Sequence, residues 1–202
     1  MSLFPIFAPL ASVGTVEQTA ATHTETNTLT PSFASQAIGS ASPTRRVVAA
    51  ANPYYSVNIP TISSYSIAGE TGTLVDKPLY SEGSLALPIM YEAVVATGTT
   101  GTMAPVFEGA ATNYNTGIIV WKVDDVGGAK SDSDIDYKSD GSSADLSLTV
   151  DTPAGGVVIA YFVSIGDPGN LTWVGVDEDV AEVACGSDGG NFHAGGSRVQ
   201  AS

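Results

Sequence analysis

Short apolar runs, each closed at both ends by turn-forming residues, constrain the fold of this chain more than any other feature. The clearest run, residues 155–164 (GGVVIAYFVS), lies between the turn-like segments 151–154 (DTPA) and 166–169 (GDPG). Runs of this length that are rich in β-branched residues and bounded by Gly, Pro, Asp or Asn are typical of β-strands. No segment shows a sustained helical period with caps at both ends. We therefore expect an all-β chain.

The expected strands follow one another at the spacing of an antiparallel sandwich, with turn residues between them. They fall within residues 33–38, 45–51, 59–67, 73–75, 85–95, 103–107, 117–123, 145–151, 155–164, 171–176 and 180–185, and a last strand is expected in the tail 191–202. The prediction is a single antiparallel β-sandwich of jelly-roll or immunoglobulin-like character, with an extended N-terminal arm.

The first 30 residues differ from the rest, because an apolar segment precedes a polar, Thr-rich tract at 17–28. No Lys or Arg precedes the apolar segment, and Pro5 and Pro9 interrupt it, which argues against a signal peptide. The same prolines favour an extended path. The polar tract is either an early edge strand or a linker that orders only against a neighbour. We divide the chain into an arm and linker (1–30) and a β-sandwich domain (31–202).

The apolar arm is a candidate anchor on another subunit, with a frayed terminus as the alternative. Its large apolar side chains would be poorly placed in water and gain free energy when buried. The predicted anchoring residues are Leu3, Phe4, Ile6, Phe7 and Leu10.

The formal net charge is -14, and most of it lies in the second half of the chain. Residues 1–100 hold 6 acidic and 3 basic residues (-3), whereas residues 101–202 hold 15 and 4 (-11). Phosphate contacts need clustered Lys and Arg, so we expect neither nucleic acid nor a membrane as a partner. No stretch reaches the roughly 18 apolar residues of a membrane span. The charge serves solubility and self-repulsion, or it binds cations or a basic partner.

Three parts of the chain together resemble β-sandwich surface and decoration proteins of tailed bacteriophage virions. The first is residues 32–51 (SFASQAIGSASPTRRVVAAA), the second is 67–75 (IAGETGTLV), and the third is 113–126 (NYNTGIIVWKVDDV) followed by 144–176 (ADLSLTVDTPAGGVVIAYFVSIGDPGNLTWVGV). The resemblance covers roughly residues 32–185 and brings no catalytic residue with it.

This resemblance implies a non-enzymatic virion structural protein, and we expect a capsid decoration (cement) protein on the head exterior. Its partners would then be other virion proteins, above all the major capsid protein, and further copies of itself in a homo-oligomer on the virion surface. Two alternatives stay open: a tail or fibre module that binds host glycans, and a bacterial surface adhesion domain. For the glycan-binding alternative, the candidate contacts are Tyr54 and Tyr55, in an expected loop.

Candidate chemistry outside this resemblance is sparse, and we expect no cofactor. The loop Asp132–Asp140 carries alternating aspartates, which are hard oxygen ligands suited to calcium, but Tyr137 stands where an EF-hand loop requires glycine. A solvated loop is the favoured interpretation. Cys185 is the only cysteine, which excludes an internal disulfide, and it is expected to be a buried, inert thiol. No nucleophile-elbow motif accompanies His23 or His193.

Overall fold

The computed structural model describes residues 14–26, 28–55, 61–76, 89–108, 113–126, 149–165, 171–184 and 191–201. Within these ranges the chain is built from antiparallel strands and contains no helix, so the all-β prediction is confirmed. The predicted anchors Leu3, Phe4, Ile6, Phe7 and Leu10 lie outside the described residues, as does the loop Asp132–Asp140.

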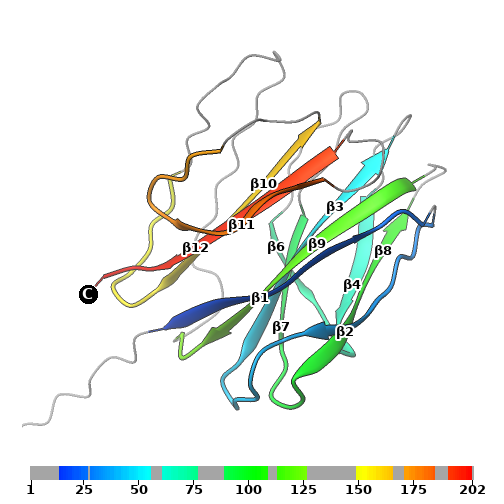
Figure 1. Cartoon of the computed structure of the whole chain (residues 1–202). Coiled ribbons are helices and arrows are strands. Elements are labelled where there is room, and N and C mark those ends of the chain that lie inside the picture. Colours follow the sequence, from blue (N-terminus) through cyan, green and yellow to red (C-terminus); the bar gives the residue numbers. More distant parts are fainter. Residues whose placement is uncertain are drawn as a thin grey trace, which may run out of the picture.

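Nine of the strands form a two-sheet sandwich (Figure 1). The larger sheet has the order β1-β9-β3-β7-β6 and consists of β1 (Thr15–Thr24), β9 (Asn113–Asp124), β3 (Arg46–Tyr55), β7 (Ile89–Val94) and β6 (Thr73–Asp76). The smaller sheet has the order β2-β8-β4-β5 and consists of β2 (Phe33–Ala37), β8 (Thr100–Glu108), β4 (Thr61–Ile67) and β5 (Glu70–Thr71). A sheet β1-β9-β3-β7 that faces a sheet β2-β8-β4-β5 is the eight-stranded jelly-roll arrangement, to which β6 is added at one edge. Of the two predicted types of sandwich, the jelly roll is therefore the one observed.

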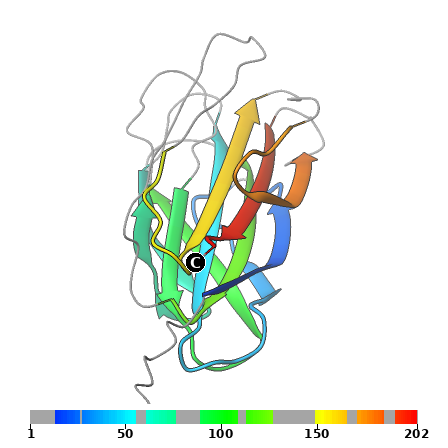
Figure 2. The ribbon, with the colours of Figure 1, turned by 90° about the vertical axis from the view of Figure 1, so that its left-hand side faces the viewer.

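A third sheet covers part of the outer face of the larger sheet (Figure 2). Its order is β10-β12-β11, and its strands are β10 (Val157–Ile165), β12 (Asn191–Val199) and β11 (Asp177–Ala184). The sandwich thus has three layers in the described residues, one more than the sequence analysis predicted.

The middle layer explains why β3 and β9 read as unbroken apolar runs. Successive side chains of a strand point to opposite faces of the sheet. In β3, Val47 and Ala49 pack in the core of the jelly roll, whereas Val48 and Ala50 pack against the third sheet. In β9, Ile118 and Val120 face the jelly-roll core, and the residues that face the third sheet are Ile119, Trp121 and Val123. Strands buried on both faces lose the polar alternation of a half-exposed strand.

Part of the polar tract is β1, an edge strand paired with β9, which is the first of the two alternatives for this tract. Two other strand expectations need revision. Residues 171–176 form no strand, and the chain re-enters a sheet only at Asp177. The described end of the expected strand 145–151, from Thr149 onward, is also irregular.

Candidate functional site

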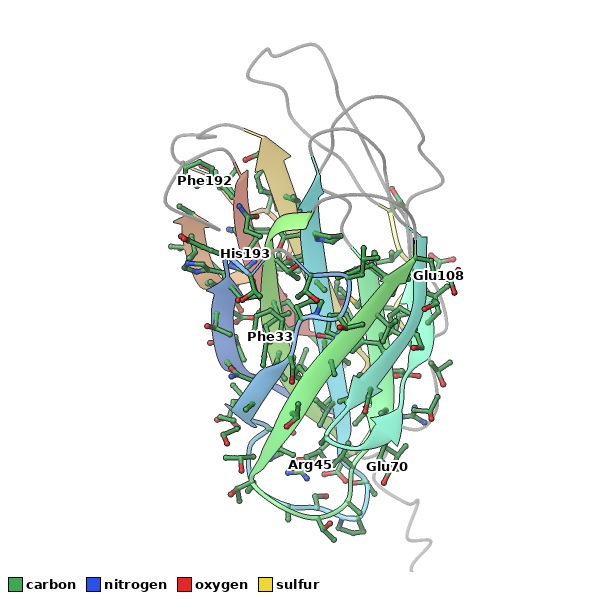
Figure 3. The ribbon with its side chains drawn as sticks, turned by 90° about the vertical axis from the view of Figure 1, so that its right-hand side faces the viewer. Phe33, Arg45, Glu70, Glu108, Phe192 and His193 are labelled. Carbon is green, nitrogen blue, oxygen red and sulfur yellow. The ribbon has the colours of Figure 1, made fainter. Side chains whose placement is uncertain are left out.

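A buried arginine closes one end of the sandwich (Figure 3). Arg45 precedes β3, and its side chain is fully buried. The guanidinium group donates five hydrogen bonds, all to backbone carbonyl oxygens, at distances of 2.6–3.2 Å: those of Ile38, Gly39, Val95, Thr97 and Gly98. These carbonyls belong to the β2–β3 and β7–β8 connections, so one side chain holds both connections together.

The electrostatics of Arg45 are those of a structural cation. Burial lowers its pKa from the ordinary value, while the charge of Asp124 acts in the opposite direction. Arginine remains protonated in proteins even when buried, so the group keeps its charge. Since its donors are occupied by backbone oxygens, Arg45 is a clamp for the fold and has little capacity left to bind an anion.

A second polar cluster joins the jelly roll to the third sheet. Tyr161 in β10 donates a hydrogen bond from its hydroxyl group to Oδ1 of Asn52 in β3, at 2.9 Å. The same hydroxyl lies 3.3 Å from Nδ1 of His193 in β12. Because the tyrosine proton is given to Asn52, the hydroxyl oxygen is the acceptor when His193 carries its proton on Nδ1. A relay His193–Tyr161–Asn52 therefore crosses from the third sheet to the jelly roll.

The relay leaves one ring nitrogen of His193 without a hydrogen-bond partner in the described structure. The residue is fully buried, and its Nε2 atom has no hydrogen-bond partner within the described structure. Burial lowers the pKa of His193 to about 4, and the nearby imidazole of His23 acts in the same direction. His193 is consequently neutral at pH 7, and in the tautomer that donates from Nδ1 its Nε2 atom carries the lone pair.

Aromatic packing surrounds this relay. The Trp121 ring lies edge-on to Tyr161, with ring centroids 6.5 Å apart, and its Nε1 donates a 2.8 Å hydrogen bond to Oδ2 of Asp179 in β11. Gly195 in β12 lets the sheets approach closely, because a Cβ atom built there would lie 2.6 Å from the Trp121 ring. The acidic cluster 177–179 opens β11, and Asp179 accepts this bond from the core tryptophan.

Most of the cations in the described residues are committed to internal contacts. These residues contain four Lys and Arg side chains, of which Arg45 is described above. Arg46 pairs with Glu92 at 3.1 Å, and Lys122 pairs with Asp124 at 2.8 Å. Only Arg198 is left exposed in this part of the chain. The accessible charge there is therefore dominated by carboxylates, several of them on β11.

The two predicted glycan contacts, Tyr54 and Tyr55, do not lie in the expected loop. They continue β3, where their backbone pairs with Asn115 and Asn113 of β9; their side chains lie outside the described ones. Two further aromatic residues, Tyr65 and Trp121, are buried in the core. Cys185 lies outside the described residues.

Sequence reasoning missed the relay and the arginine clamp. Asn52 interrupts the small apolar residues of β3, and Arg45 stands directly before them. A polar residue inside a doubly buried strand is a signal for an internal hydrogen-bond network. The partners Tyr161 and His193 come from distant strands, so only the topology brings them together.

The Arg45 cluster and the His193–Tyr161–Asn52 relay hold sheets and connections in place, because their hydrogen-bond donors are directed at acceptors within the protein. The described residues contain no helix that is long and apolar enough to cross a membrane. Comparison of this chain with protein-family models, curated proteins and solved structures gives no match.

Proposed function

We propose that this protein is a non-enzymatic structural component of a bacteriophage virion, a decoration protein on the exterior of the capsid. The observation that carries the proposal is the jelly-roll strand order, an arrangement recurrent in viral capsid proteins and lectins. It is an argument from fold analogy. The sequence resemblance to decoration proteins of tailed phages supports the same role.

The polar chemistry of the described residues is consistent with a protein that works by its surfaces. Arg45 and the relay of Asn52, Tyr161 and His193 make internal bonds. In this proposal the acidic exterior keeps neighbouring particles apart by repulsion, while apolar contacts attach the protein to the shell. The N-terminal arm supplies those contacts.

The test is to determine where the protein resides and in how many copies. Virions purified from the source phage are analysed by quantitative mass spectrometry, and the protein is located by immunogold electron microscopy. The expected result is hundreds of copies per particle, located on the head. A small number of copies, located on the tail, would contradict the decoration role and support the alternative of a tail or fibre module. Absence from purified particles would overturn a virion function altogether.

The glycan-binding alternative is favoured by one observation, the position of Tyr54 and Tyr55. Both lie at the end of β3, where their backbone pairs with Asn115, which is buried, and Asn113 of β9, so aromatic and amide residues are neighbours at one end of the sheet. Lectin domains also use the jelly roll. A glycan array probed with the full chain tests this role: a hit lost in both Tyr54→Ala and Tyr55→Ala would support it, and no hit would count against it.

A further inference from the structure

The two histidines of the chain, His23 and His193, lie close together although they stand near opposite ends of the sequence. His23 is in β1, the edge strand of the larger sheet, and His193 is in β12, the central strand of the third sheet. The two strands contact each other, and Figure 3 shows His193 beside β1, the blue strand. After burial, the imidazole of His23 is the second cause that lowers the pKa of His193, so the two rings are near enough to interact.

The register of the larger sheet places His23 on the face that is turned toward the third sheet. His23 pairs with Gly117 of β9, and Gly117 pairs with Asn52 of β3, so these three residues form one row across three strands. Residues directly opposite each other in antiparallel strands have their side chains on the same face. Asn52 faces the third sheet, because it bonds to Tyr161, and His23 therefore faces it as well. Gly117 has no side chain, so groups from the third sheet can approach the middle of the row.

His193 offers a ligand atom to this region. Its Nε2 atom is buried and has no hydrogen-bond partner in the described structure. A buried polar atom of this kind costs free energy unless something binds it. In the tautomer that donates from Nδ1, Nε2 carries a lone pair, and a neutral imidazole with a lone pair on one nitrogen is the form that binds a metal ion.

The relay from His193 through Tyr161 to Asn52 gives this ring the support that a metal-binding histidine needs. A histidine that binds a metal through one nitrogen almost always donates its other N–H to a fixed acceptor, which sets the tautomer and the orientation of the ring. Here the acceptor is the hydroxyl oxygen of Tyr161, 3.3 Å from Nδ1, and the hydroxyl group in turn donates to Asn52 at 2.9 Å. The ring of Tyr161 also packs edge-on to that of His193. The imidazole of His193 is therefore held in place from its Nδ1 side, which leaves Nε2 as the ligand atom.

His23 supplies a second imidazole from the edge of the larger sheet. Its side chain is exposed and makes no hydrogen bond or ion pair in the described structure. An exposed side chain can turn between rotamers, so His23 can carry an ion from the solvent to Nε2 of His193. Among the described residues no group of three His, Cys, Asp or Glu side chains could hold a metal ion. Water would therefore complete the coordination of an ion held by the two imidazoles.

We propose that His23 and His193 together bind one divalent transition-metal ion, of the class of Zn²⁺, Cu²⁺ and Ni²⁺, between β1 and the third sheet. Imidazole nitrogen suits these ions, whereas Ca²⁺ and Mg²⁺ prefer oxygen ligands. Only the folded chain brings the two ligands together, so binding stabilises the fold and links the jelly roll to the third sheet. The sequence analysis expected no cofactor, because the topology alone makes these histidines neighbours. The proposal does not depend on the virion role.

Isothermal titration calorimetry of the untagged full chain with Zn²⁺, in a buffer that holds excess Mg²⁺, tests the proposal. The Mg²⁺ occupies weak acidic surface sites, which matter in a chain with a net charge of -14. We expect one Zn²⁺ per chain, with a dissociation constant that rises at least tenfold in His23→Gln and in His193→Gln. The matched control is Glu17→Gln, which removes an exposed carboxylate from the same strand as His23 and should leave the dissociation constant unchanged. Zn²⁺ binding that His23→Gln leaves unchanged, or no binding of Zn²⁺ at all, would overturn the proposal.

His23→Gln decides the question even if His193→Gln fails to fold, because the side chain of His23 is exposed. A second readout identifies the ligands in the unmodified protein. Cu²⁺ bound to the full chain should show the nitrogens of two imidazoles in electron spin echo spectroscopy. A signal from one imidazole, or from none, would exclude the two-histidine site.

Discussion

At the residue scale, the neighbouring residues Arg45 and Arg46 make different contacts, so a substitution at one serves as the control for the same substitution at the other. Arg45 is buried and bonds only to carbonyl oxygens, whereas Arg46 makes a single ion pair with Glu92. Lysine has a single ammonium group and cannot reproduce five bonds to spread-out acceptors. We predict that Arg45→Lys lowers the free energy of unfolding by about 3 kcal/mol.

The control, Arg46→Lys, should cost less than about 1 kcal/mol, since it keeps a partly exposed ion pair. Urea unfolding followed by tryptophan fluorescence measures both variants. Equal losses would mean that the carbonyl bonds of Arg45 contribute little, and the clamp interpretation would be wrong.

Two buried tyrosine hydroxyls provide the second residue-scale prediction. The hydroxyl of Tyr65 is buried without a hydrogen-bond partner in the described structure, which also raises its pKa above the ordinary value. Tyr161, in contrast, bonds to Asn52. Removing an unsatisfied hydroxyl relieves a desolvation cost, whereas removing a bonded one leaves its partner unsatisfied. Tyr65→Phe should be neutral or stabilising by about 1 kcal/mol, and Tyr161→Phe destabilising by about 1–3 kcal/mol. Thermal unfolding by calorimetry would decide, and the reverse order would contradict both assignments.

His193 makes the stability of the protein depend on pH. Its pKa is about 4 in the folded protein, against an ordinary value of 6.5. Between these values the unfolded chain binds the proton and the folded protein does not, so stability falls as the pH drops from 6.5 to 4. The stabilisation is fully present above pH 6.5, and its loss by pH 4 amounts to about 3 kcal/mol.

The matched variant His193→Gln cannot titrate and isolates this contribution from that of the carboxylates. Urea unfolding at pH 7, 6, 5 and 4 should show a steeper loss for the unmodified protein than for the variant. Parallel curves would mean that His193 titrates normally and that its burial has no consequence for stability.

At the scale of elements, the third sheet depends on a close approach between β12 and β9. Gly195 faces Trp121 and Ile119, and a methyl group there would overlap the indole ring. Overpacking of this kind costs about 1–3 kcal/mol. We predict that Gly195→Ala destabilises by this amount, and that the penalty shrinks in a Trp121→Phe background, where the smaller ring leaves space.

A double-mutant cycle measured by chemical denaturation tests this coupling. Additive effects of Gly195→Ala and Trp121→Phe would show that the glycine is needed for some reason other than its contact with the tryptophan.

Most strands of the jelly roll were predictable because they carry a local signal, whereas β5 (Glu70–Thr71) was not among the expected strands. The apolar, β-branched character of residues 45–51 and 117–123 predicts strands, and all of these residues except Arg45 lie in β3 and β9. Their burial on two faces implied a layer on each side, which the prediction of a single sandwich did not include. The continuation of β3 past Pro53 was also missed: pairing with β7 ends at Ala51, and pairing with β9 alone continues, so a residue without an N–H group is tolerated there.

The internal polar contacts were less predictable, because they depend on long-range pairing. The apolar residues 171–176 favour a strand in the sequence, whereas the acidic residues 177–179 that follow them carry no strand signal. The bond from Trp121 to Asp179 exists only once β11 is placed beside β12 on the larger sheet. A sequence shows which residues favour a strand, but the choice of partner strand depends on the packing of the whole chain.

At the scale of the whole molecule, the contacts at the start of the first strand bear on the role of the apolar arm. Strand β1 starts at Thr15, and the backbone N–H of Gly14 donates a 2.9 Å hydrogen bond to the carbonyl oxygen of Gly155, just ahead of β10. The attachment of the arm is thus fixed by contacts that begin at Gly14. Changes confined to residues 2–12 leave these contacts untouched.

The arm provides the last prediction, which concerns assembly. Deletion of residues 2–12 should leave the melting temperature nearly unchanged, because Gly14 and β1 remain, and it should weaken incorporation into particles. A variant that keeps the length but replaces Leu3, Phe4, Ile6, Phe7 and Leu10 with serine should behave like the deletion, since burial of each large side chain contributes roughly 1.5–3 kcal/mol before ordering costs. Incorporation is measured by quantifying the protein on particles that lack the native copy.

Normal incorporation of both variants would exclude anchoring by the arm. A large drop in melting temperature would instead assign these side chains to the core, and incorporation of the serine variant alone would show that the length of the arm matters and its apolar character does not.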